Sequence, residues 1–152
     1  MTTKQQVDPR VSFRADDRLA RQLAERARGD ESVSLVARRQ LERFHALLDD
    51  SLADAREALR LTPSEAGFLA AIANGVFWEL ASARLVWAEV LDADDALAAE
   101  WGVDKETLAE RLRALSVAQR LAVIDALERW WARAGDGDQD GLAEGLSAVG
   151  LL

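Results

Sequence analysis

Six residues near the N-terminus, Arg10-Val11-Ser12-Phe13-Arg14-Ala15, alternate between polar and apolar side chains. A period of two is typical of a β-strand with one buried face, which here consists of Val11, Phe13 and Ala15. A single strand cannot satisfy its own backbone hydrogen bonds, and the rest of the chain has helical patterns. We therefore expect the strand to pair antiparallel with the same strand of a second copy, so that the chain forms a homodimer.

The opposite face of this paired strand would display polar side chains from both copies. A two-stranded ribbon fits the major groove of DNA, where arginine and serine side chains can bind base edges. The sequence thus predicts three base-contacting residues, Arg10, Ser12 and Arg14. The alternative interpretation is an edge strand whose polar side chains face only solvent.

Two helices are expected after the strand. The first covers about residues 16–28, because an aspartate at residue 16 or 17 can cap its start and Gly29 can end it. The second begins near Ser32 and keeps apolar residues at spacings of three and four as far as about Arg60. Its start offers backbone N–H groups and hydroxyls that suit a phosphate as well as N-capping, which predicts phosphate contacts at Ser32, Val33 and Ser34.

Residues 10–48 resemble a ribbon-helix-helix DNA-binding domain. The likeness covers the strand, the two aspartates that open the first helix, Gly29, and the runs 32–36 and 38–44 of the second helix. The turn at residues 29–31 is longer and more acidic than is usual in this family. The resemblance implies a dimer whose shared core includes Val11, Phe13, Leu41 and Phe44.

The formal net charge of the 152 residues is −8, which at first sight argues against DNA as a partner. Residues 1–50 contain ten basic and nine acidic residues, whereas residues 51–152 contain nine and eighteen. Affinity for phosphate depends on the charge near the binding surface. Because most of the acidity lies in the C-terminal part, the net charge is a weaker objection to DNA binding by the N-terminal part. The chain has no cysteine, hence no disulfide or thiolate metal site, and we expect a cytoplasmic protein without a membrane-spanning segment.

The fold class predicted from these patterns is mainly α, with an N-terminal ribbon-helix-helix and an all-helical C-terminal domain. We expect a flexible arm (1–9), a DNA-binding and dimerisation domain with an extended second helix (10–60), a helical domain (61–134) and a Gly/Asp-rich tail (135–152). Capping boxes at Thr62–Glu65 and Ser116–Gln119 predict two of the C-terminal helix starts.

Candidate chemistry outside the N-terminal region is sparse. His45 is the only histidine, and no arrangement of residues suggests a catalytic site, a metal site or a cofactor. Residues 136–141 match half of a calcium loop, but Ser147 stands where the loop needs a glutamate, so a solvated acidic linker is the better interpretation. Trp130 and Trp131 are adjacent; core packing is the ordinary role, and Trp130 is a candidate partner surface.

We therefore expect a homodimeric, sequence-specific DNA-binding regulator of transcription, acting as a repressor. Its partners would be double-stranded DNA, a second copy of itself, with higher-order assembly on DNA left open, and a protein bound through the C-terminal domain. One alternative is an antitoxin whose C-terminal part binds a toxin. Another is a protein-interaction module that uses the fold only to dimerise.

Overall fold

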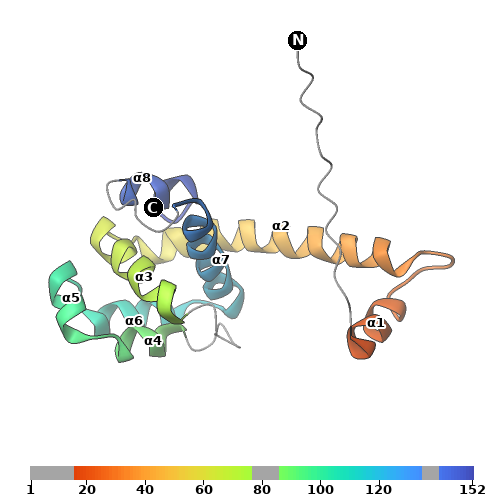
Figure 1. The fold of residues 1–152 in the computed structure, drawn as a ribbon, viewed down its shortest axis with the longest axis horizontal. Coiled ribbons are helices and arrows are strands. Elements are labelled where there is room, and N and C mark those ends of the chain that lie inside the picture. Colours follow the sequence, from red (N-terminus) through yellow and green to blue (C-terminus); the bar gives the residue numbers. More distant parts are fainter. Residues whose placement is uncertain (1–15, 77–85, 135–140) are drawn as a thin grey trace, which may run out of the picture. The chain divides into compact units, whose positions relative to one another are not determined.

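The computed structural model describes residues 16–76, 86–134 and 141–152, and every element in these ranges is an α-helix (Figure 1). The helices are α1 (Asp17–Ala24), α2 (Val33–Leu59), α3 (Pro63–Val76), α4 (Val86–Asp92), α5 (Asp95–Trp101), α6 (Lys105–Ala114), α7 (Val117–Ala134) and α8 (Leu142–Ala148). The chain divides into two compact units, Met1–Arg43 and Phe44–Leu152.

The predicted fold class is wrong in its N-terminal part. The described residues contain helices and no strand, so they give no ribbon-helix-helix arrangement. A strand needs a second strand to satisfy its backbone groups, and the helices of the described chain offer none. The predicted strand itself, residues 10–15, lies outside the described residues. The mainly α character that was expected is found.

The first unit contains α1 and the beginning of α2. Asp16 caps α1 by accepting a hydrogen bond from the backbone N–H of Leu19 at 2.7 Å. The helix ends at Ala24, earlier than predicted, because the N–H groups of the next turn bond to carbonyls only three residues back. Gly29, in the turn before α2, has a φ of 58°, which glycine adopts without steric cost.

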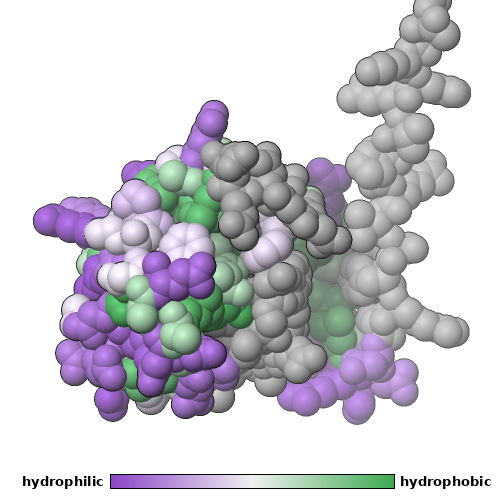
Figure 2. Space-filling view, turned by 60° about the vertical axis from the view of Figure 1, so that its left-hand side comes forward, coloured by the Kyte–Doolittle hydropathy of each residue, from purple (hydrophilic) through white to green (hydrophobic). Residues whose placement is uncertain are grey.

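The second unit is a helical bundle built around α3, which contacts α4, α5, α7 and α8. Phe68 and Leu69 of α3 are fully buried, and leucines of α6, α7 and α8 surround them in one hydrophobic core. The face of this unit in the foreground of Figure 2 has hydrophilic residues along its margin, with hydrophobic residues visible between them. This pattern is normal for a folded surface.

The predicted helix boundaries in the second unit are largely confirmed. The capping box at Thr62 and Glu65 forms reciprocal hydrogen bonds of 2.8 and 3.2 Å, and the box at Ser116 and Gln119 does the same. Gly102 ends α5 with a φ of 64°. These contacts are local in the sequence, which is why they could be predicted.

The division between the units differs from the predicted domain boundary at residue 60. Helix α2 ends at Leu59, as expected, but its residues Leu48, Leu52, Ala55 and Leu59 belong to the core of the second unit. Part of the region predicted as a Gly/Asp-rich tail belongs to the same core, because Leu146, Val149 and Leu151 are buried there. The calcium-like run at residues 136–140 lies outside the described residues.

Candidate functional site

Among the described residues, the first unit contains one small cluster of buried apolar side chains. It consists of Leu23 from α1 and of Val36 and Ala37 from α2, with Ala27 partly buried beside them. Residues 1–15 of this unit lie outside the described residues. The described part of the first unit thus buries few apolar side chains.

The middle of α2 carries apolar side chains that nothing in the described chain covers. All seven residues from Leu41 to Leu47 are exposed. Leu41, Phe44 and Leu47 retain 51%, 42% and 51% of their accessible surface. Because successive members are three residues apart, Leu41 and Phe44 are neighbours on the helix surface, and so are Phe44 and Leu47. Two of the predicted dimer-core residues, Leu41 and Phe44, are thus brought together on one exposed apolar surface.

The start of α2 is free to receive a ligand at its backbone. The Ser32 hydroxyl accepts a hydrogen bond from the N–H of Leu35 at 3.3 Å, and the Ser32 carbonyl accepts from Leu35 and Val36. Within the part of the chain that is described, the N–H groups of Val33 and Ser34 have no acceptor. Val33 and Ser34 are exposed, so both N–H groups are available to an anion at the positive end of the helix.

One of the two carboxylates in the turn before α2, that of Glu31, is paired with a cation. The Glu31 carboxylate is bound by the guanidinium of Arg39 and accepts a hydrogen bond from the N–H of Arg28 at 3.2 Å. Mainly through the Arg39 hydrogen bond, the pKa of Glu31 is held below its usual value. The carboxylate expected to repel phosphate here is therefore paired with a cation.

Trp130, the candidate partner surface, lies in the core of the second unit. Its side chain is 7% exposed and packs so closely on α8 that a Cβ added to Gly145 would lie 2.6 Å from Nε1. Its neighbour Trp131 is partly buried and donates from Nε1 to the carbonyl of Ala70 at 2.9 Å. Trp130 packs α7 against α8, and Trp131 hydrogen-bonds α7 to α3. Because Trp130 is buried, little of its side chain is accessible to a partner.

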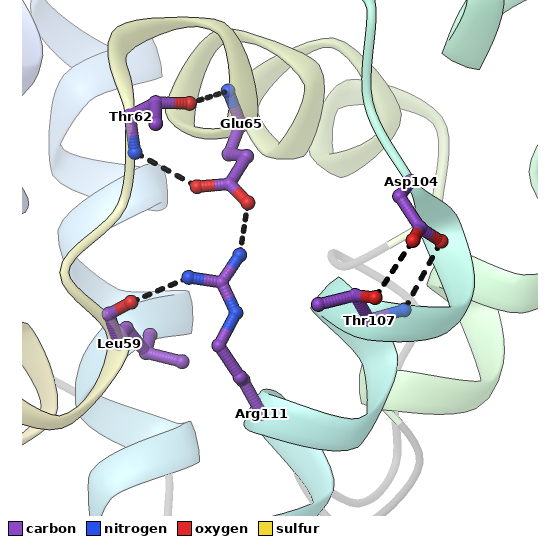
Figure 3. Close-up of polar contacts among 6 residues, drawn as sticks. All are labelled: Leu59, Thr62, Glu65, Asp104, Thr107 and Arg111. Atoms are coloured by element: carbon purple, nitrogen blue, oxygen red, sulfur yellow. Dashed lines mark hydrogen bonds and ion pairs between the residues drawn. The ribbon is translucent and has the colours of Figure 1, made fainter.

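A polar cluster that the sequence did not reveal joins three helices of the second unit (Figure 3). Arg111 of α6 donates to the carbonyl of Leu59 at the end of α2 at 2.6 Å and forms an ion pair with Glu65 near the start of α3. Glu65 also accepts from the N–H of Thr62 at 2.8 Å. These contacts tie α6 to the end of α2 and to the start of α3.

A second guanidinium has a similar structural role. Arg120 is buried and donates to the carbonyls of Leu112, Arg113 and Leu115, which satisfies the end of α6. The sequence alone does not identify these two arginines, since only the tertiary structure places carbonyl acceptors beside them.

The remaining predicted residues are placed as follows. The base-contacting residues Arg10, Ser12 and Arg14 and the core residues Val11 and Phe13 lie outside the described residues. His45 is exposed on α2 beside Phe44, with their ring centroids 6.0 Å apart. In the described ranges, no group of histidine, aspartate or glutamate side chains is arranged to bind a metal, and no helix is long and apolar enough to cross a bilayer.

The chain matches no family model, no curated protein and no solved structure. On the geometry of the described residues, the candidate site is the exposed surface of α2. Its middle is apolar, and the backbone N–H groups at its start are accessible to an anion.

Proposed function

We propose that this chain is a homodimeric DNA-binding regulator of transcription, whose copies associate through the middle of α2. The observation that carries the proposal is the exposed run from Leu41 to Leu47, with three large apolar side chains on a helix. Covering them with a second copy removes apolar surface from water twice, once in each chain.

The first unit is also the part of the chain best suited to DNA. Its described residues contain seven arginines and six carboxylates, against a net charge of −8 for the whole chain. The start of α2 supports a phosphate contact, because two backbone N–H groups there are available and Glu31 is paired with Arg39. The proposal does not require a β-ribbon.

The dimer is tested first, by sedimentation equilibrium on the full chain at micromolar concentration. We expect a dimer for the unmodified protein and a monomer for Phe44→Asp, because a carboxylate would enter the apolar contact from both copies. The matched control is Ala46→Asp, which adds the same charge to the same helix but on the opposite side. A folded monomer of the unmodified chain, or an intact Phe44→Asp dimer, would contradict the proposal.

The DNA contact is tested by fluorescence anisotropy with two labelled duplexes, one from upstream of the chain's own gene and one unrelated. Ser34→Glu places a carboxylate at the second residue of α2 and should weaken binding to both duplexes by about tenfold or more. Ser64→Glu is the control, since Ser64 is the exposed second residue of α3. If Ser34→Glu binds as tightly as the unmodified chain, α2 does not contact phosphate.

The second candidate function is an interaction module that dimerises without binding DNA. The net charge of −8 favours it, because an acidic body repels the phosphate backbone. The two candidates differ in one measurement: a dimer that binds neither duplex at 50 mM salt is the module.

A further inference from the structure

Two exposed charges of opposite sign flank the apolar surface of α2. Arg43 and Asp50 are seven residues apart, which is nearly two full turns and about 10 Å along the axis, so both lie on the same side of the helix. That side adjoins Phe44 and Leu47. Among the residues the structure describes, neither Arg43 nor Asp50 forms an ion pair.

The other charges of this stretch are differently placed. Arg38 and Glu42 form an ion pair of 2.8 Å within the helix. Asp49 lies on the side of α2 opposite Phe44 and Leu47, because it follows Phe44 by five residues, or about 140° around the helix. Arg43 and Asp50 are therefore the charges that a second helix docked on Phe44 and Leu47 would meet.

We infer that two copies of α2 pair antiparallel over residues 41–50, with Arg43 of each copy beside Asp50 of the other. This inference rests on the proposed dimer and specifies its orientation. A two-fold axis perpendicular to both helices lays Phe44 of one copy on Leu47 of the second copy. It also brings the same side of each helix together, and the reversed direction places each arginine next to an aspartate.

A parallel pair lacks these contacts. Its two-fold axis runs along the helices and places the Arg43–Asp50 flanks of the two copies on opposite sides of the contact, so neither charge meets its counterpart. The apolar residues alone fit either direction. The charge order along α2, basic before Phe44 and acidic after Leu47, is what selects the antiparallel one.

Charge reversal tests this orientation in the full chain. Arg43→Asp or Asp50→Arg alone replaces two attractive contacts per dimer with two repulsive ones and should raise the dimer dissociation constant by roughly tenfold or more. The double variant restores opposite charges and should return the constant to within about threefold of the original. High salt should shrink both single effects. Asp49→Arg is the control and should leave dimerisation unchanged.

Cross-linking gives an independent measure of direction, because the chain contains no cysteine of its own. A mixture of Arg43→Cys and Asp50→Cys chains, treated with a short bismaleimide, should yield mainly mixed dimers. Arg43→Cys chains that cross-link equally well on their own would overturn the inference.

Failure of this inference is distinguishable from failure of the proposed function. Charge reversals without effect, or a double variant weaker than each single one, would refute the antiparallel contact. In that case Phe44→Asp would still decide whether α2 is the dimer surface at all.

Discussion

Replacing Arg111 by methionine should destabilise the second unit by about 2–4 kcal/mol. Methionine keeps most of the apolar stem but removes the donors to the Leu59 carbonyl and the Glu65 carboxylate. The bond to the carbonyl is 2.6 Å long and charge-assisted, and such bonds contribute about 1.5–3 kcal/mol. The ion pair adds about 1 kcal/mol at most, because its side chains remain 29% and 17% exposed.

The measurement is urea unfolding followed by tryptophan fluorescence, since all five tryptophans lie between residues 78 and 131. Glu65→Gln should cost only about 1 kcal/mol, because glutamine can still complete the capping box with Thr62 and accept from Arg111 through its carbonyl. The control is Arg56→Met, an exposed arginine of α2, with an expected change below about 0.5 kcal/mol. An Arg111→Met protein within about 0.5 kcal/mol of the original, at the same urea dependence, would refute the reasoning.

Three further predictions follow from burial in the second unit. Gly145→Ala should lower the free energy of unfolding of the second unit by about 1–3 kcal/mol in thermal unfolding, because the new methyl group overlaps Trp130. This loss outweighs alanine's higher helix propensity. Gly141→Ala is the control and should leave the stability nearly unchanged, because no atom lies within 4 Å of the added methyl group. Burial raises the pKa of Glu128 above its ordinary value of 4.5, so Glu128→Gln should stabilise the protein at pH 7. That gain should be lost as the pH falls through the raised pKa towards 4.5, below which the glutamate is protonated in both states. A fragment of residues 1–60 should show less helix by circular dichroism than α1 and α2 have in the full chain, because Leu48, Leu52 and Leu59 would lose the core against which they pack. A fragment with undiminished helix content would contradict the assignment of these leucines to the second unit.

The sequence was a good guide wherever the cause of structure is local. Hydrogen bonds between residues three apart fix the starts of α3 and α7, and these could be identified from the capping boxes alone. The length of α2 followed from its apolar spacing up to Leu59.

The fold class was wrong where the prediction depended on a second chain. The alternation at residues 10–15 indicates a strand only if a partner strand is available, and the described part of the single chain supplies helices alone. The burial of Trp130 was similarly out of reach. Adjacent tryptophans show no preference between core and surface until one knows that Gly145 gives one of them room.

The candidate site was partly predictable. Periodicity places Leu41 and Phe44 on the apolar side of α2, and this was recognised in the sequence. Periodicity does not tell which turns of a long helix its own chain will cover. That Leu47 belongs to the exposed group, whereas Leu48 is buried, depends on where the second unit begins.

The exposed middle of α2 also bears on how long a solitary copy survives. A helical segment whose residues are exposed opens locally at less cost than a buried one, and local opening is what a protease needs in order to cut a backbone. Arg43, beside Phe44 in this stretch, is a cleavage point for trypsin-like enzymes. The proposed dimer would cover this stretch, so limited proteolysis at Arg43 should slow as the protein concentration rises.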